Sequence, residues 1–123
     1  MKMNSIVEAD KKLNFADFLV SRGDSETYSS AAFKHVMNAA TIVLKILTDL
    51  DDNSLNSPQL VAKTLKRFNE PKAADFSKFY IGLLKLTGKP KIPVADVEVL
   101  IKQTRDFMQW VQEHRVDTDV KPY

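Results

Sequence analysis

The chain has 123 residues, of which 44% are hydrophobic, and it contains no cysteine. This length and composition suffice for one domain with a buried core, while the lack of cysteine excludes disulfide frameworks, thiolate zinc sites and cysteine nucleophiles. The net charge of +2 conceals an uneven distribution, because residues 61–92 carry eight basic side chains against two acidic ones. The segments before and after 61–92 are each slightly acidic.

The beginning of the chain, MKMNSIVEADKKLNFADFL, has neither the uninterrupted apolar stretch nor the small-residue cleavage site of a signal peptide. The longest uncharged stretch in the apolar part of the chain, residues 35–44, is far shorter than the roughly 20 residues that span a bilayer. We therefore expect a cytoplasmic protein without a membrane segment.

Apolar residues recur at helical spacing from residue 5 to residue 20, and Gly23 is suited to cap the end of this first helix. The second helix is expected over residues 27–50. Its apolar stripe contains small residues that allow close approach of a partner helix, and the stripe consists of Ala32, Val36, Ala39, Ala40, Val43, Leu47 and Leu50.

Ser57 followed by Pro58 predicts the start of a third helix, because serine caps helix N-termini and proline is tolerated at the first helical position. This helix is expected to end at Glu70–Pro71. A fourth helix is predicted over residues 75–87 and a fifth over 94–114. The pattern indicates an all-α protein: an antiparallel up-and-down four-helix bundle, with or without an extra short helix, over residues 1–115, followed by a polar tail over 116–123.

The chain has a helix that ends in a short polar turn and is followed by a long alanine-bearing helix, in the segment ADFLVSRGDSETYSSAAFKHVMNAATIVLKIL. It also has a closing helix, ADVEVLIKQTRDFMQWVQEH. Over roughly residues 8–115 the chain resembles the HEPN family of four-helix bundles, which includes nucleotidyltransferase substrate-binding subunits and prokaryotic toxins. Ribonucleases of that family carry an arginine four to six residues before a histidine, and no arginine here precedes His35 or His114 by that interval. The resemblance therefore implies a member without nuclease activity.

The residues themselves indicate no catalytic or metal site. His35 and His114 share no ligand spacing, and His114 suits the negative C-terminal end of its helix. Asp49, Asp51 and Asp52 lack the glycine and closing glutamate of a calcium loop, so we interpret them as helix-terminating residues. We assign no catalytic residue, no metal and no cofactor.

Two surfaces are candidates for binding. Lys63, Lys66 and Arg67 group on the third helix and form the candidate partner-binding site. A second face of the last helix, with Phe107, Trp110 and His114, is the candidate self-association site, since tryptophan is enriched at interfaces. The alternative for the three basic residues is an ordinary solvated helix face. The alternative for Trp110 is a position at the edge of the core.

We therefore expect a non-catalytic binding module that forms a homo-oligomer, a dimer in the first instance, and binds a protein partner. The resemblance implies a nucleotidyltransferase or a toxin–antitoxin counterpart as that partner. One alternative is an RNA-binding protein that uses the basic segment 61–92, where even weak nucleic-acid binding would depend on salt. The other is a degenerate metal-independent ribonuclease that uses His35 or His114.

Overall fold

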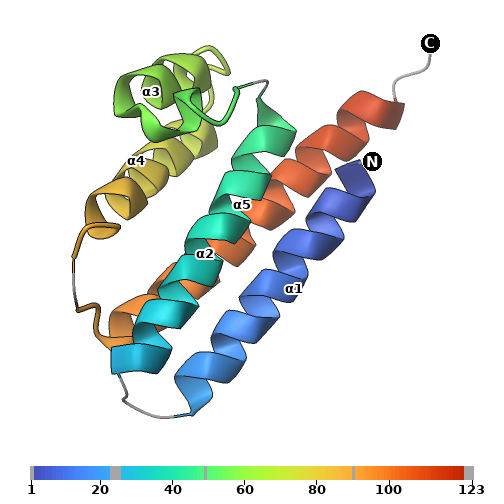
Figure 1. Ribbon diagram of the computed structural model, residues 1–123. Coiled ribbons are helices and arrows are strands. Elements are labelled where there is room, and N and C mark those ends of the chain that lie inside the picture. Colours follow the sequence, from blue (N-terminus) through green and yellow to red (C-terminus); the bar gives the residue numbers. More distant parts are fainter. Residues whose placement is uncertain (1, 23–25, 49, 90, 121–123) are drawn as a thin grey trace. The chain divides into compact units, whose positions relative to one another are not determined.

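The computed structural model (Figure 1) describes residues 2–22, 26–48, 50–89 and 91–120, with the side chains of all but 2–4, 26 and 114–120. Every regular element in these ranges is helical, which confirms the all-α class. The elements are α1 (Lys2–Ser21), α2 (Glu26–Leu47), the 3-10 helix η1 (Ser54–Asn56), α3 (Pro58–Lys66), α4 (Pro71–Leu86) and α5 (Val94–Val120). They divide into two compact units, residues 1–47 with 91–123 and residues 48–90.

The first unit consists of α1, α2 and α5, and α1 and α2 form an antiparallel pair that α5 contacts along both helices (Figure 1). Small residues line the buried sides of α1 and α2, since Ala9, Ala16, Ala32 and Ala39 are fully buried. Small side chains at buried positions allow neighbouring helices to approach closely. The described larger apolar residues that are buried in the unit are Leu13, Leu19, Val20, Phe33, Val36, Val43, Leu44, Ile46, Leu47, Ile92, Val97, Ile101, Phe107, Met108 and Val111.

A polar contact fixes the segment that leads into α5. The hydroxyl of Ser29, which is buried on α2, donates a hydrogen bond to the carbonyl of Ile92. Because a buried hydroxyl without a partner is costly, this bond both satisfies Ser29 and ties the start of α5 to α2.

The second unit contains η1, α3 and α4. As predicted, Ser57 caps α3: its Oγ accepts a hydrogen bond from the backbone N–H of Leu60 at 3.3 Å, and Pro58 occupies the first turn. Asn69 ends the α3 turn with a left-handed backbone, φ 53°, which asparagine adopts more readily than most residues. The described buried side chains of this unit are Thr48, Leu55, Val61, Leu65, Ala73, Phe76, Ser77, Tyr80 and Leu83.

Several helix bounds differ from those expected. α2 ends at Leu47, so Leu50 lies beyond the helix that was predicted to include it. α4 begins at Pro71 rather than at residue 75, because proline opens a helix as well at this position as at Pro58. α5 continues to Val120 instead of ending at residue 114, because the sequence offers no glycine or proline between His114 and Val120 to stop the helix.

The antiparallel four-helix arrangement remains a prediction. In the described residues, none of the helices is both long and apolar enough to cross a membrane.

Candidate binding surfaces

The α3 basic face consists of Lys63, Lys66 and Arg67 and lies opposite the buried side of the helix. Val61 and Leu65 are fully buried, whereas all three basic side chains are exposed. The local fold explains this placement, since Ser57 caps the start of α3 and Val61 and Leu65, four positions apart, both face inward. Among the side chains that the structure describes, none forms an ion pair with these three residues.

A pocket of about 430 Å³ opens beside this face, where α3 ends and α4 begins. It is lined by Leu65, Lys66, Asn69, Glu70, Pro71 and Ala74. Its walls are mostly apolar, with one basic and one acidic side chain contributed by Lys66 and Glu70. Such a mixture can accept an apolar side chain together with a charged or polar group.

The residues of the predicted self-association site differ in how far they are buried. Phe107 is only 7% exposed and belongs to the core of the first unit, while Trp110 is half-buried. His114 lies on α5, but its side chain is outside the described residues. Self-association through α5 stays a prediction, and of its two described side chains Trp110 is the more accessible.

Two exposed phenylalanines on α1 stack on each other, and the sequence pattern was not used to predict them as a surface group. Phe15 is 47% exposed and Phe18 is 52% exposed, and their rings stack with centroids 6.0 Å apart. The guanidinium carbon of Arg22 lies 5.5 Å from the centre of the Phe18 ring, in cation–π distance. The spacing of apolar residues in the sequence indicates this exposure, because both phenylalanines fall outside the stripe formed by Ala9, Leu13 and Ala16.

His35 borders this aromatic group from α2. Its ring meets the Phe15 ring edge-on at 4.8 Å, and its buried Nδ1 has no hydrogen-bond partner in the described part of the chain. Burial, and secondarily the charge of Lys12, lowers the pKa of His35, so the imidazole is neutral at pH 7. The surroundings are those of a packed ring, with no serine or threonine nucleophile among its described contacts.

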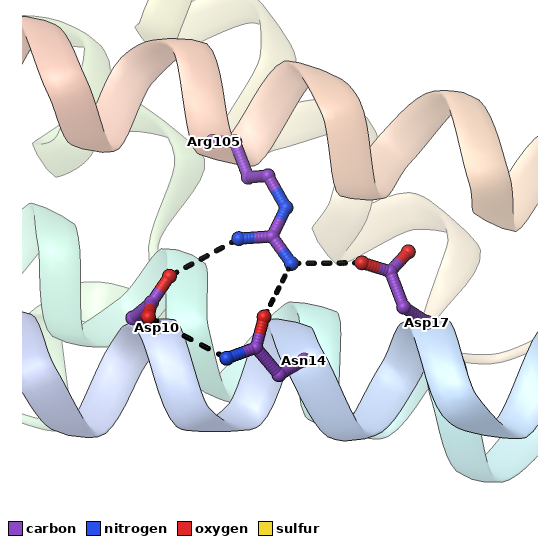
Figure 2. A network of polar contacts seen from close by, with 4 residues as sticks. All are labelled: Asp10, Asn14, Asp17 and Arg105. Atoms are coloured by element: carbon purple, nitrogen blue, oxygen red, sulfur yellow. Dashed lines mark hydrogen bonds and ion pairs between the residues drawn. The ribbon is translucent and has the colours of Figure 1, made fainter.

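On a different side of α1 from these phenylalanines, the helix is joined to α5 by a polar network around Arg105 (Figure 2). The guanidinium donates to Asp10 at 3.1 Å, to Asn14 at 2.9 Å and to Asp17 at 2.8 Å. The three acceptors lie on successive turns of α1, and Asn14 also donates to Asp10 at 3.5 Å. Arg105 therefore holds the carboxylates of Asp10 and Asp17 toward α5.

The acidic cluster after α2 caps a turn. Asp51 accepts a hydrogen bond from the backbone N–H of Ser54 at 2.8 Å, and contacts with Ser54 lower the pKa of its carboxyl group. Asp52 is exposed nearby, and Asp49 lies outside the described residues. Where the structure describes side chains, no three histidine, aspartate or glutamate residues gather in a way that would hold a metal ion.

Comparison of the chain with protein-family models, with curated proteins and with solved structures finds no match.

Proposed function

We propose that this protein is a non-catalytic helical binding module that associates with itself and binds an acidic protein partner through the α3 basic face. The observation that supports partner binding is the exposure of Lys63, Lys66 and Arg67 together, with no described acidic side chain paired to them. Three unpaired charges of one sign on one helix favour association with a surface of opposite sign.

The neighbouring pocket adds a means of specificity to this face. Lys66 belongs to both the basic face and the pocket wall, so a carboxylate that pairs with Lys66 would bring its neighbours to the pocket mouth. The apolar lining from Leu65, Pro71 and Ala74 would then accept one apolar side chain of the partner. A few anchors of this kind carry most of the energy of typical interfaces.

The resemblance to HEPN bundles suggests which partners to examine first: a nucleotidyltransferase or a toxin–antitoxin counterpart. The surroundings of His35 favour binding over catalysis, because its ring packs against Phe15 and faces no described nucleophile.

The test is affinity purification of the tagged protein from its source at moderate salt, followed by identification of stoichiometric partners. We expect one protein partner that is lost from the triple variant K63E/K66E/R67E. A matched control, K78E/K85E/K89E, changes the charge of the same unit by the same amount at other exposed lysines and should retain the partner. Equal retention by both variants would refute the assignment of the α3 basic face. Nucleic acid that survives a salt wash, in place of a protein, would favour the RNA-binding alternative.

A further inference from the structure

The outward face of α1 carries a regular stripe of charged and aromatic residues, which we call the α1 stripe: Glu8, Lys11, Phe15, Phe18 and Arg22. Successive members are three or four residues apart, so Glu8, Lys11, Phe15 and Phe18 follow one side of α1, and Arg22 extends the stripe into the turn directly after the helix. All five are exposed. Exposed phenylalanines that stack on each other are unusual on a surface that faces only water, and such patches mark interaction sites.

The charges of the α1 stripe are arranged around Phe15. Glu8 precedes Phe15 by seven residues and Arg22 follows it by seven, which places one negative and one positive group about 10 Å on either side. The ring of Phe18 holds the Arg22 guanidinium over this face. Neither Glu8 nor Arg22 forms an ion pair with another described side chain.

The other acidic groups of α1 are kept away from this face. Asp10 and Asp17 both accept hydrogen bonds from Arg105 on the side of α1 that meets α5 (Figure 2). Glu8 is therefore the carboxylate that the α1 stripe presents, and its natural complement within the stripe is Arg22.

We propose that a second copy of this chain packs on the α1 stripe, with the two α1 helices antiparallel across a two-fold axis at Phe15. This symmetry brings Phe15 against its equivalent and pairs Glu8 of each copy with Arg22 of the other, so that both ion pairs form at once. Phe18 then faces the lysines around position 12 of the other copy, where an ammonium group over the ring is favourable.

The charge pattern also selects this register over its neighbour. If the axis lay midway between Phe15 and Phe18, Lys11 of each copy would face Arg22 of the other, and the two like-charged pairs would repel. A shallow crossing angle, near the roughly 20° that is common between antiparallel helices, keeps residues 10 Å from the axis within reach of each other.

A single pair of helices buries less surface than the 1,200 Å² or so of a standard interface, so we expect a reversible monomer–dimer equilibrium. This inference rests on the proposed self-association and names its surface. It is tested by sedimentation equilibrium from micromolar to near-millimolar protein, with far-UV circular dichroism of each variant to establish that it is folded.

The decisive variants are charge reversals. R22E should raise the dimer dissociation constant on the order of tenfold, since it replaces two ion pairs by two like-charged contacts. The double variant E8R/R22E restores opposite charges and should return the constant to within about threefold of the original. K34E, an exposed charge reversal on α2 outside the α1 stripe, is the matched control and should leave the constant unchanged.

The outcomes separate this inference from the proposed function. Weakening by R22E with recovery in E8R/R22E supports the α1 stripe as the interface. A dimer that is insensitive to both variants, or weakened by both alike, overturns the stripe but leaves self-association intact, and loss of that dimer in W110A would assign it to α5. A protein that stays monomeric over the whole concentration range overturns both the stripe and the self-association.

Discussion

Replacing Arg105 by methionine tests whether the network in Figure 2 holds α1 to α5. Methionine keeps an apolar stem of similar length, so the variant loses the guanidinium contacts without opening a large cavity. It removes two ion pairs, to Asp10 and Asp17, and one hydrogen bond to Asn14. The partners remain in contact with water, because the Asp10 and Asp17 side chains are 47% and 53% exposed.

The expected loss follows from these exposures. Exposed ion pairs contribute about 0.2–1 kcal/mol each and a hydrogen bond about 1 kcal/mol, so we expect R105M to lower the free energy of unfolding by about 2 kcal/mol. High salt screens the ion pairs and leaves the hydrogen bond, which reduces the expected loss to about 1 kcal/mol in 1 M NaCl.

Urea denaturation at low and high salt measures both quantities from the midpoint and slope of the transition. R67M is the control, because Arg67 is exposed and has no described ion pair, and we expect a change within about 0.5 kcal/mol. A loss for R105M no larger than that of R67M, or one that does not change with salt, would refute an electrostatic role for the network.

Three further predictions concern stability. L13A should cost about 2–5 kcal/mol in urea denaturation, because Leu13 is fully buried between helices, and a loss below 1 kcal/mol or so would contradict its core position. S57A should cost about 1 kcal/mol by removing the cap of α3, and S57D should retain most of that stability; equal losses in both would argue against capping. The lowered pKa of His35 means that the unfolded chain binds its proton more readily, so stability present above pH 6.5 should decline as the pH falls below that value. Thermal melts at pH 7.5 and 5.5 should show this decline to be smaller in H35Q, and an identical decline would remove His35 as its source.

The sequence pattern predicts the apolar stripe of α2 well. Six of its residues are buried: Ala32, Val36, Ala39, Ala40, Val43 and Leu47. A continuous apolar stripe determines which side of a helix packs against its neighbours, so the pattern identifies the buried side. Ser57 and Pro58 likewise predict the start of α3, since their effect depends only on local backbone geometry. Pro71 marks the start of α4 in the same way. Because no large apolar residue lies between Pro71 and Phe76, the apolar pattern predicted a later start for this helix.

Surface sites are harder to predict because they depend on which side of a helix remains uncovered. Phe107 and Trp110 are three residues apart on α5, yet the first is buried and the second half-buried. Phe15 and Phe18 lie off the buried stripe of α1, so comparison with Ala9, Leu13 and Ala16 identifies them as exposed. The hydrogen bond from Arg105 to Asp10 joins residues 95 positions apart. The apolar periodicity of a single helix does not indicate which residue of another helix its side chains contact.

The most direct test of a binding module is native mass spectrometry of the complex purified from its source at moderate salt. The proposal predicts species that contain two copies of the 13.9 kDa chain, together with a second protein in fixed stoichiometry. A single species of 13.9 kDa, with no partner and no second copy at any protein concentration examined, would contradict it.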